Sequence, residues 1–408
     1  MDPILRSHAD TIISAAIRAV QPDAAVRRAL ENQTFPGRVI LVAAGKAAWQ
    51  MAKAASGCLA IDAGIVITKY GHVMGSLPNC RCFEAGHPVP DENSFAATRK
   101  ALALTEGLSE TDTVLFLLSG GGSALFESPL ISGEELQDIT SQLLASGADI
   151  VEINTIRKRL SAVKGGRFAQ HCAPAKVFSI VLSDIIGDPL DMIASGPAVP
   201  DTSTCAQALA ISEKYTLNLG DHARALLSAE TPKELTNVNT RITGSVRELC
   251  TAAAEACREL GYEPILLTDR LCCQAKEAGS FLASIVRTHA DSGRKLAFIA
   301  GGETVVQLTG TGKGGRNQEL ALAAAEGIAG IPGTAIFSIG SDGTDGPTDA
   351  AGGYVDYETA ALLEEKGISV YETLRNNDAY HALQAINGLI LTGPTGTNVN
   401  DVAVALLR

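Results

Sequence analysis

The chain of 408 residues is poor in aromatic side chains and in long apolar runs. Phe, Trp and Tyr make up 4% of it, whereas 46% of the residues are hydrophobic, so its cores must be built mainly from Ala, Leu, Ile and Val. The longest apolar stretches, such as Thr113–Leu118, are far shorter than the roughly 20 residues that span a bilayer. The first ten residues also lack a signal-peptide pattern. We therefore expect a cytoplasmic protein without a membrane partner.

Clustered positive charge and paired cysteine motifs are missing as well. The formal net charge is -12, and such a chain repels a phosphate backbone, so nucleic acid is excluded as a partner. The nine cysteines are an odd number and form no C-x-x-C pair with a matching downstream set. Reduced structural thiols are the simplest interpretation. Zinc is not supported, since no H-E-x-x-H motif occurs.

Short continuous apolar runs that end in glycine and lead into Ala/Leu-rich segments recur along the chain. This pattern is typical of mainly parallel sheets covered by helices on both faces. The polar stretch of residues 228–245 has the composition of a link between two units. We predict an α/β protein with an N-terminal doubly wound domain over residues 1–235 and a second α/β domain over residues 236–408, with a cleft between them.

Two segments of the N-terminal domain have the properties of an anion site. Lys46 follows the run "VILVAAG" at the start of a helical segment, where a cation works against the helix dipole unless it reaches an anionic ligand. "SGGGSAL", from Ser119 to Leu125, follows the run "TVLFLL" and offers backbone N–H groups unobstructed by Cβ atoms, as in a phosphate cradle. The alternatives are a solvated surface lysine and a tight turn with Ser123 as a helix cap.

Carboxylates cluster after one apolar run in each predicted domain. Such clusters suit Mg²⁺ ligation or a general base, and turn-forming aspartates are the alternative. His87, in "AGHPVPDENS", could act as a base, although a histidine before proline in a turn is more often structural. The clustered aspartates are Asp184, Asp188 and Asp191 in "LSDIIGDPLD", and Asp342, Asp345 and Asp349 in "SDGTDGPTD".

The segment "ETVVQLTGTGKGGRNQE" reads as a strand, a glycine loop and a helix. Gly310, Gly312 and Gly315 match the dinucleotide fingerprint G-x-G-x-x-G, which also requires a lone acid about 20 residues further on. Lys313 and Arg316 instead place two cations among the glycines, and the next strand leads into an aspartate cluster. Cations, glycines and carboxylates together favour the transfer of a phosphoryl group over dinucleotide binding.

Eight motifs together resemble the glycerate 2-kinases, the two-domain proteins with a C-terminal MOFRL domain that are related to a protein once labelled hydroxypyruvate reductase. The resemblance covers nearly the whole chain in order. The motifs are "AAGKAA", "GHPVPDENS", "LSGGGSAL", "INTIRKRLSAVKGGRFA", "LSDIIGDPLDMIASGP", "GGETVVQLTGTGKGGRNQE", "SDGTDGPTDAAG" and "LTGPTGTNVND".

The resemblance implies ATP-dependent phosphorylation of D-glycerate at its 2-hydroxyl, with Mg²⁺, in a cleft between a Rossmann-like and a mixed-sheet domain. By motif, the catalytic residues fall on Lys46, Asp188 and Arg316. We interpret Asp184, Asp342 and Asp345 as metal ligands. The predicted nucleotide-binding residues are Ser119, Gly120, Gly121, Gly122 and Ser123, which make the N-terminal lobe the favoured one, together with Gly312 and Lys313.

Two other functions stay open at this point. A hydroxypyruvate reductase that uses NAD(P)H would account for the literal glycine fingerprint. A non-catalytic sensor of sugar acids would bind ligand without releasing ADP, but it would have no need of a catalytic base. The sequence does not decide which related hydroxy acids are accepted, or whether the protein is a homodimer.

Overall fold

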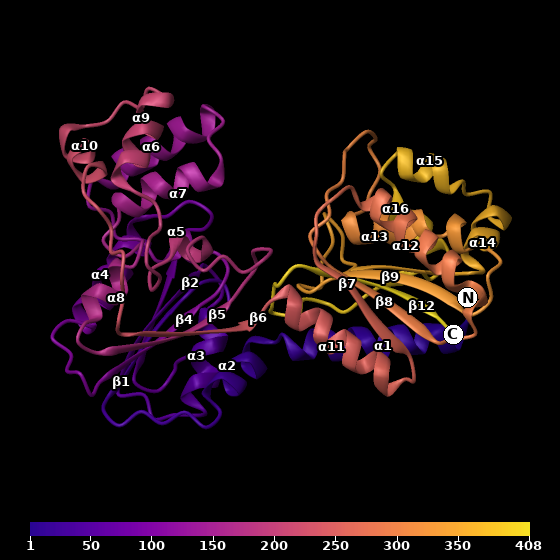
Figure 1. Ribbon diagram of the computed structural model, residues 1–408, viewed down its shortest axis with the longest axis horizontal. Coiled ribbons are helices and arrows are strands. Elements are labelled where there is room, and N and C mark those ends of the chain that lie inside the picture. Colours follow the sequence, from indigo (N-terminus) through magenta and orange to yellow (C-terminus); the bar gives the residue numbers. More distant parts are fainter. The chain divides into compact units, whose positions relative to one another are not determined.

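The computed structural model describes residues 1–408 and divides into two compact units, one of residues 22–243 and one of residues 1–21 with 244–408. Figure 1 labels the elements of both. Each unit contains one six-stranded sheet covered by helices on both faces. The predicted combination of two α/β units, one Rossmann-like and one with a mixed sheet, is confirmed.

The sheet of residues 22–243 has the strand order β3-β2-β1-β4-β5-β6. The pairings along β3-β2-β1-β4-β5 are all parallel, and this order is that of the Rossmann fold. The strand order reverses between β1 and β4, so the crevice beyond their carboxyl ends is the expected place for a ligand. The strands are β1 (Val39–Ala44), β2 (Ala63–Lys69), β3 (Cys80–Ala85), β4 (Thr113–Leu118), β5 (Lys176–Leu182) and β6 (Val238–Gly244).

Both faces of the central strands are buried, which explains why β1 and β4 read as unbroken apolar runs. One face packs against α2 and α3, the other against α4 and α8, and a third core lies among α6, α7, α9 and α10. The helices are α2 (Pro22–Leu30), α3 (Ala48–Ser56), α4 (Glu92–Leu104), α5 (Gly122–Leu125), α6 (Gly133–Ala145), α7 (Ile150–Arg159), α8 (Arg167–Cys172), α9 (Cys205–Lys214) and α10 (Asp221–Leu227).

The second sheet is mixed, with the order β11-β10-β9-β12-β8-β7. Only β7 and β8 pair in parallel, while β12 runs antiparallel between β8 and β9. Its elements are α11 (Val246–Glu259), β7 (Glu263–Leu271), α12 (Ala275–His289), β8 (Leu296–Gly302), α13 (Arg316–Ala324), β9 (Thr334–Gly340), β10 (Gly352–Asp356), α14 (Thr359–Glu365), α15 (Val370–Arg375), α16 (Ala379–Ala385), β11 (Leu389–Ile390) and β12 (Asp401–Leu407).

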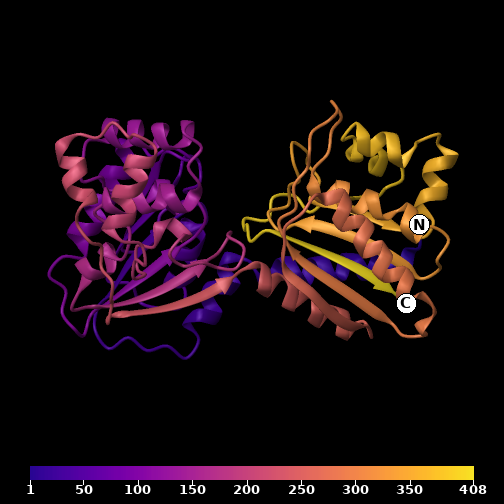
Figure 2. The same ribbon diagram turned by 45° about the horizontal axis from the view of Figure 1, so that its top comes forward.

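The first helix of the chain, α1 (Pro3–Ala19), belongs to the unit with the mixed sheet, and this differs from the expected continuous domain of residues 1–235. Buried Leu5, Ala9, Ile12 and Ala16 lie on one face of α1 and pack with α11 against this sheet. Figures 1 and 2 both show α1 beside α11. The apolar stripe predicts a packed helix but carries no information about its partner.

Two local expectations also differ from the structure. The polar stretch of residues 228–245 is not wholly a link, because it contains β6, the edge strand beside β5. The segment "ETVVQL" is not a strand, since β8 ends at Gly302 and Val305 makes only an isolated bridge with Gln274. Val305 and Leu308 are exposed, and Val306 is only partly buried, so this segment has no covered face on both sides to stabilise a strand. No helix of the structure is long and apolar enough to cross a membrane.

Candidate active site

Lys46 and the glycine loop of residues 119–123 lie together at the point where the strand order reverses. Lys46 follows β1, and the loop follows the neighbouring strand β4. The Lys46 N–H donates to the Gly120 carbonyl at 2.9 Å, and the Ala47 N–H donates to Ser119 Oγ at 3.1 Å. These bonds connect the ends of the two strands, so the structure brings together the two segments that the sequence predicted as an anion site.

Glycine is required where these two turns touch. Gly45 has φ +128°, and a Cβ on it would lie 2.2 Å from Ser119 Oγ. The Lys46 side chain is half-buried, and its ammonium has no ion-pair or hydrogen-bond partner in the protein. A lysine in this environment is available to an anionic ligand, and its role as an anion-binding residue stays a prediction.

The segment after β5 packs against the same glycine loop. A Cβ on Gly120 would lie 2.2 Å from Asp184 Oδ2, and one on Gly122 would lie 2.8 Å from the Cβ of Ala194. Asp188 adopts φ +52°, and its Oδ1 is buried without a hydrogen-bond partner. An unpaired buried carboxylate oxygen is costly, and such atoms concentrate where a ligand or ion completes the structure. Asp184 thus lies at the glycine loop, whereas a role for Asp188 beyond the turn that it occupies stays a prediction.

Two cations, the buried Lys164 and the partly buried Arg157, contact the end of the glycine loop, and no role was predicted for them. Lys164 is completely buried and donates to the carbonyls of Ser123 at 2.9 Å and Phe126 at 3.1 Å. It also forms an ion pair of 3.2 Å with buried Glu127, and Arg157 donates to the Ser123 carbonyl at 3.2 Å. Burial lowers the pKa of Lys164 to about 8, although Glu127 opposes this shift. These contacts fix the backbone of the loop.

Both cations come from the motif "INTIRKRLSAVKGGRFA", which the sequence analysis used only for the resemblance. A run containing Arg157, Lys158 and Arg159 normally indicates a solvated helix face. Here Lys158 and Arg159 are buried as well and pair with buried Asp201 at 3.1 and 3.8 Å. Four cations within eight residues, ending at Lys164, were the signal that could have suggested an internal role.

In the other unit, Arg316 is the first residue of α13 and is held by two carboxylates. Its Nε and Nη2 donate to the two oxygens of Asp401 at 2.6 and 3.0 Å, and its Nη1 donates to Glu303 at 2.8 Å. Burial raises the pKa of Asp401 to about 6, while the guanidinium opposes this rise. Guanidinium has five N–H donors, so one on Nη1 and one on Nη2 remain for a ligand.

Buried polar atoms without partners also occur close to Arg316 in sequence or strand register. They are Thr304 Oγ1, which follows β8, and Asn400 Nδ2, which precedes β12, and these two strands pair beside each other. Both side chains are nearly inaccessible to solvent. Unpaired buried donors and acceptors of this kind are consistent with a ligand-binding role for this edge of the sheet.

Asp345 and Asp342 are engaged by backbone N–H groups in this unit. Both oxygens of Asp345 accept N–H groups at the start of α13, from Asn317 at 3.1 Å and Gln318 at 2.9 Å. This is the contact of a helix-capping carboxylate. Asp342 accepts the Thr344 N–H at 3.0 Å and stays partly exposed. No three His, Cys, Asp or Glu side chains are grouped closely enough to form a metal cage, and metal ligation by these two aspartates stays a prediction.

The loop of residues 303–315 uses its glycines for packing against its own unit. A Cβ on Gly310 would lie 2.4 Å from the Cα of Asn376, and one on Gly312 would lie 2.4 Å from the Cβ of Asp378. The ammonium of Lys313 lies 4.2 Å from the centre of the Tyr380 ring. A dinucleotide fingerprint needs a tight turn between strand and helix, but this loop spans all the residues between Gly302 and Arg316.

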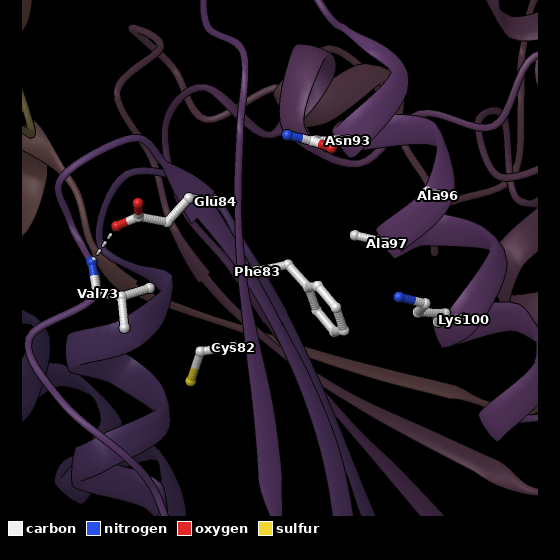
Figure 3. Close-up of a pocket in the computed structure, with 8 residues that line it drawn as sticks. All are labelled: Val73, Cys82, Phe83, Glu84, Asn93, Ala96, Ala97 and Lys100. Atoms are coloured by element: carbon white, nitrogen blue, oxygen red, sulfur yellow. Dashed lines mark hydrogen bonds between the residues drawn. The ribbon is translucent and has the colours of Figure 1, made fainter.

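Figure 3 shows a hollow on the edge strand β3, lined by Val73, Cys82, Phe83, Glu84, Asn93, Ala96, Ala97 and Lys100. None of the predicted site residues lines it. Glu84 accepts the Val73 N–H at 2.9 Å and so fixes the loop after β2. The same loop carries His72, whose Nδ1 lies 3.2 Å from the Lys46 carbonyl oxygen. Through Glu84 and His72, the lining of the hollow is connected to the turn that carries Lys46.

Comparison with known proteins assigns the class of this chain. Residues 8–228 match a domain of unknown function (DUF4147), and residues 296–401 match the MOFRL family. A D-glycerate 2-kinase from Thermotoga maritima is 52% identical over 99% of this chain and 98% of its own length. The crystal structure of a glycerate kinase from Thermotoga maritima superposes with a TM-score of 0.95 at 51% identity, covering 100% of both chains.

The chain is thus a two-unit α/β protein of the class that joins a DUF4147 unit to a MOFRL unit. Within that class it belongs to the glycerate 2-kinase family. A more distant relative from Agrobacterium vitis, 39% identical over 97% of this chain and 93% of its own length, is provisionally named hydroxypyruvate reductase. The resemblance stated from the motifs is confirmed.

Proposed function

We propose that the chain transfers the γ-phosphoryl group of ATP to the 2-hydroxyl of D-glycerate, giving 2-phosphoglycerate and ADP. The observation that carries this proposal is the unpaired Lys46 beside the glycine loop, in a chain of the glycerate 2-kinase family. Catalysis of phosphoryl transfer consists mostly of positioning and of stabilising negative charge. Lys46, which has no competing carboxylate, would stabilise the negative charge. The glycines of the loop, which have no Cβ atoms, would position the phosphate.

We assign the phosphate-binding role in residues 22–243 to Lys46 and to the loop from Ser119 to Ser123. The glycines let phosphate oxygens approach the backbone, and the Lys46 ammonium balances their charge. Lys164 and Arg157 keep the loop in place through the Ser123 carbonyl. The predicted nucleotide roles of Gly312 and Lys313 have less support, because the glycines of this loop, Gly310 and Gly312, already pack against residues 376–378.

Mg²⁺ fits the carboxylates at the glycine loop. Asp184 lies against Gly120, and Asp188 has a buried oxygen without a partner. Mg²⁺ is usually held by one or two carboxylates together with substrate phosphates, so a preformed protein cage is not required. Asp184 and Asp188 would hold the ion, which would neutralise charge on the phosphate oxygens. We expect activity to vanish with EDTA and to return with Mg²⁺; full turnover in chelator would contradict this assignment.

We assign Arg316 to the recognition of a carboxylate or phosphate group. Its bidentate pairing with Asp401 fixes the plane of the guanidinium, and the two remaining N–H groups present a planar donor pair. Asp401 and Glu303 therefore position the arginine for its ligand. Asp345 orients the same residue indirectly, because it caps the first turn of α13.

The proposal is tested by ADP release with D-glycerate, L-glycerate and no acid. Coupling to enolase alone should give phosphoenolpyruvate from the product, because enolase accepts 2-phosphoglycerate. A signal that requires added phosphoglycerate mutase would mean that the 3-hydroxyl is phosphorylated. Rapid oxidation of NADH by hydroxypyruvate would instead support the reductase, which the long packed loop of residues 303–315 does not favour.

A further inference from the structure

His87 lies over the glycine loop, although it follows the edge strand β3. A Cβ on Gly121 would lie 2.9 Å from His87 Cδ2, 3.0 Å from His87 Nε2 and 3.3 Å from Lys46 Cγ. The edge of the imidazole that carries Nε2 therefore faces the loop, next to the Lys46 side chain. In the sheet, β2 and β1 lie between β3 and β4. A histidine that served only the turn after β3 would have no need to reach the loop after β4.

The turn that carries His87 is held firmly, while the imidazole itself is not tied down. A Cβ on Gly86 would lie 2.6 Å from the Val89 carbonyl oxygen and 3.0 Å from Asp91, which caps α4. The half-buried ring of His87 has no hydrogen-bond or ion-pair partner in the protein. Its position is thus set by the backbone, and both ring nitrogens remain available. Each of the other six histidines has a polar contact or an aromatic neighbour of its own.

The charges around His87 favour a neutral imidazole. Burial lowers its pKa below the ordinary value, and the cations Lys46 and Lys69 lower it further. On the other side of the loop, Asp184 lies against Gly120. Asp91 is occupied by the N–H of Ser94 and the hydroxyl of Tyr70. A neutral imidazole can accept a proton near neutral pH.

We propose that His87 is a further catalytic residue, the general base that takes the proton from the 2-hydroxyl of D-glycerate. The inference rests on the proposed function. The hydroxyl proton moves to Nε2 as the hydroxyl oxygen forms a bond to the γ-phosphorus of ATP. The bond between that phosphorus and the β,γ-bridging oxygen breaks, and ADP leaves with the electron pair. The products are 2-phosphoglycerate, ADP and one proton released from the imidazole.

The two other candidate catalytic residues of this unit, Lys46 and Asp188, are less suited to this step. Lys46 has no ion-pair partner in the protein, and its positive charge suits the phosphate oxygens better than a hydroxyl proton. Asp188 adopts the left-handed φ of +52° and buries one oxygen, which fits an ion ligand held in one orientation. His87 combines a neutral nitrogen with an orientation toward the loop, as a base must.

Chemical rescue tests the proposal directly. His87→Ala and His87→Gln should each lower kcat/KM for D-glycerate by on the order of 10²-fold or more, which is within the usual contribution of a general base. The KM for ATP should change little. Free imidazole should restore part of the turnover of His87→Ala and should not change the turnover of the control, His222→Ala. His222 contacts the Leu130 carbonyl oxygen at the surface, and its replacement should leave turnover unchanged.

The pH profile provides a second readout. In the wild type, kcat/KM should fall on the acid side, below pH 6.5, because the protonated imidazole cannot accept a proton. His87→Gln should lose this limb, provided that its thermal midpoint matches the wild type. Normal kcat in both variants, or a raised KM for ATP without imidazole rescue, would overturn the proposal and make His87 a binding residue. A wild type that makes no 2-phosphoglycerate would instead overturn the proposed function.

Discussion

Lys46 and Arg316 are the candidate catalytic cations of the two units, and their surroundings differ in one respect. Lys46 has no carboxylate partner, whereas Arg316 is held by Asp401 and Glu303. An unpaired cation gains most from an anionic ligand, because no internal ion pair competes. A paired guanidinium is weaker as a charge but better oriented. We therefore expect Lys46 to supply charge and Arg316 to supply a fixed donor geometry.

The largest effect is expected for the unpaired cation. Lys46→Ala should lower kcat/KM by on the order of 10³-fold, about 4 kcal/mol, since nothing else at the glycine loop replaces its charge. The thermal midpoint should stay within a few degrees of the wild type. Lys53→Ala, on the exposed side of the following helix α3, is the control and should have nearly normal kinetics. Near-normal activity of Lys46→Ala would make it an ordinary surface cation.

A large loss of stability is expected for the buried cation behind the loop. Lys164→Met leaves the buried Glu127 with only the more distant Arg157, 3.9 Å away, and breaking a buried pair costs about 3–5 kcal/mol. The free energy of unfolding, measured in urea, should fall by about 3 kcal/mol. The double variant Lys164→Met, Glu127→Gln should recover much of this loss, because the unpaired charge is gone. If the double variant were no more stable than the single one, the pair would not be the source of the loss.

Replacement of the paired guanidinium should have an intermediate effect. Arg316→Lys keeps one positive charge near Asp401 but loses the planar donor pair, so we expect kcat/KM to fall by about 10²-fold, or about 3 kcal/mol. The unfolding free energy should fall by no more than about 1 kcal/mol. Arg375→Lys, at a surface ion pair with Glu372, is the matched control. Inactivity that simply follows unfolding would assign Arg316 a structural role.

The smallest effect is expected where a glycine packs against its own unit. Gly312→Ala brings a Cβ into contact with Asp378, and overpacking of this kind typically costs 1–3 kcal/mol. We expect about 1 kcal/mol in the unfolding free energy and a KM for ATP that changes less than twofold. Gly120→Ala, whose Cβ would meet Asp184 at the candidate phosphate loop, should raise that KM instead. A reversed result would move the nucleotide to the loop of residues 303–315.

The sequence predicted the parts of the site that local chemistry determines. Lys46 and the loop after β4 follow apolar runs, and parallel strands bring such turns to one edge of a sheet, so their proximity could be expected. The roles of Lys164 and Glu127 could not be predicted, since a charged residue in a charged run usually contacts water. The position of His87 at the glycine loop depends on a turn that reaches across neighbouring strands, and no sequence spacing contains that information.

The fold shows the same division. Apolar periodicity identified strands, helices and two α/β units, because burial on both faces leaves a direct pattern in the sequence. The placement of α1 could not be predicted, since its stripe of Leu5, Ile12 and Ala16 would suit either unit. The segment "ETVVQL" was misleading because β-branched residues favour a strand only where neighbours pack on them.

The position of α1 has a consequence for the order in which the protein can fold during synthesis. This helix is made before residues 22–243, but α11 and the mixed sheet that cover its apolar face are made only after them. At about 5–20 residues per second, that face stays uncovered for some tens of seconds. The Rossmann-like unit can fold in the meantime, so chaperone binding to the nascent chain should concentrate on the first 20 residues.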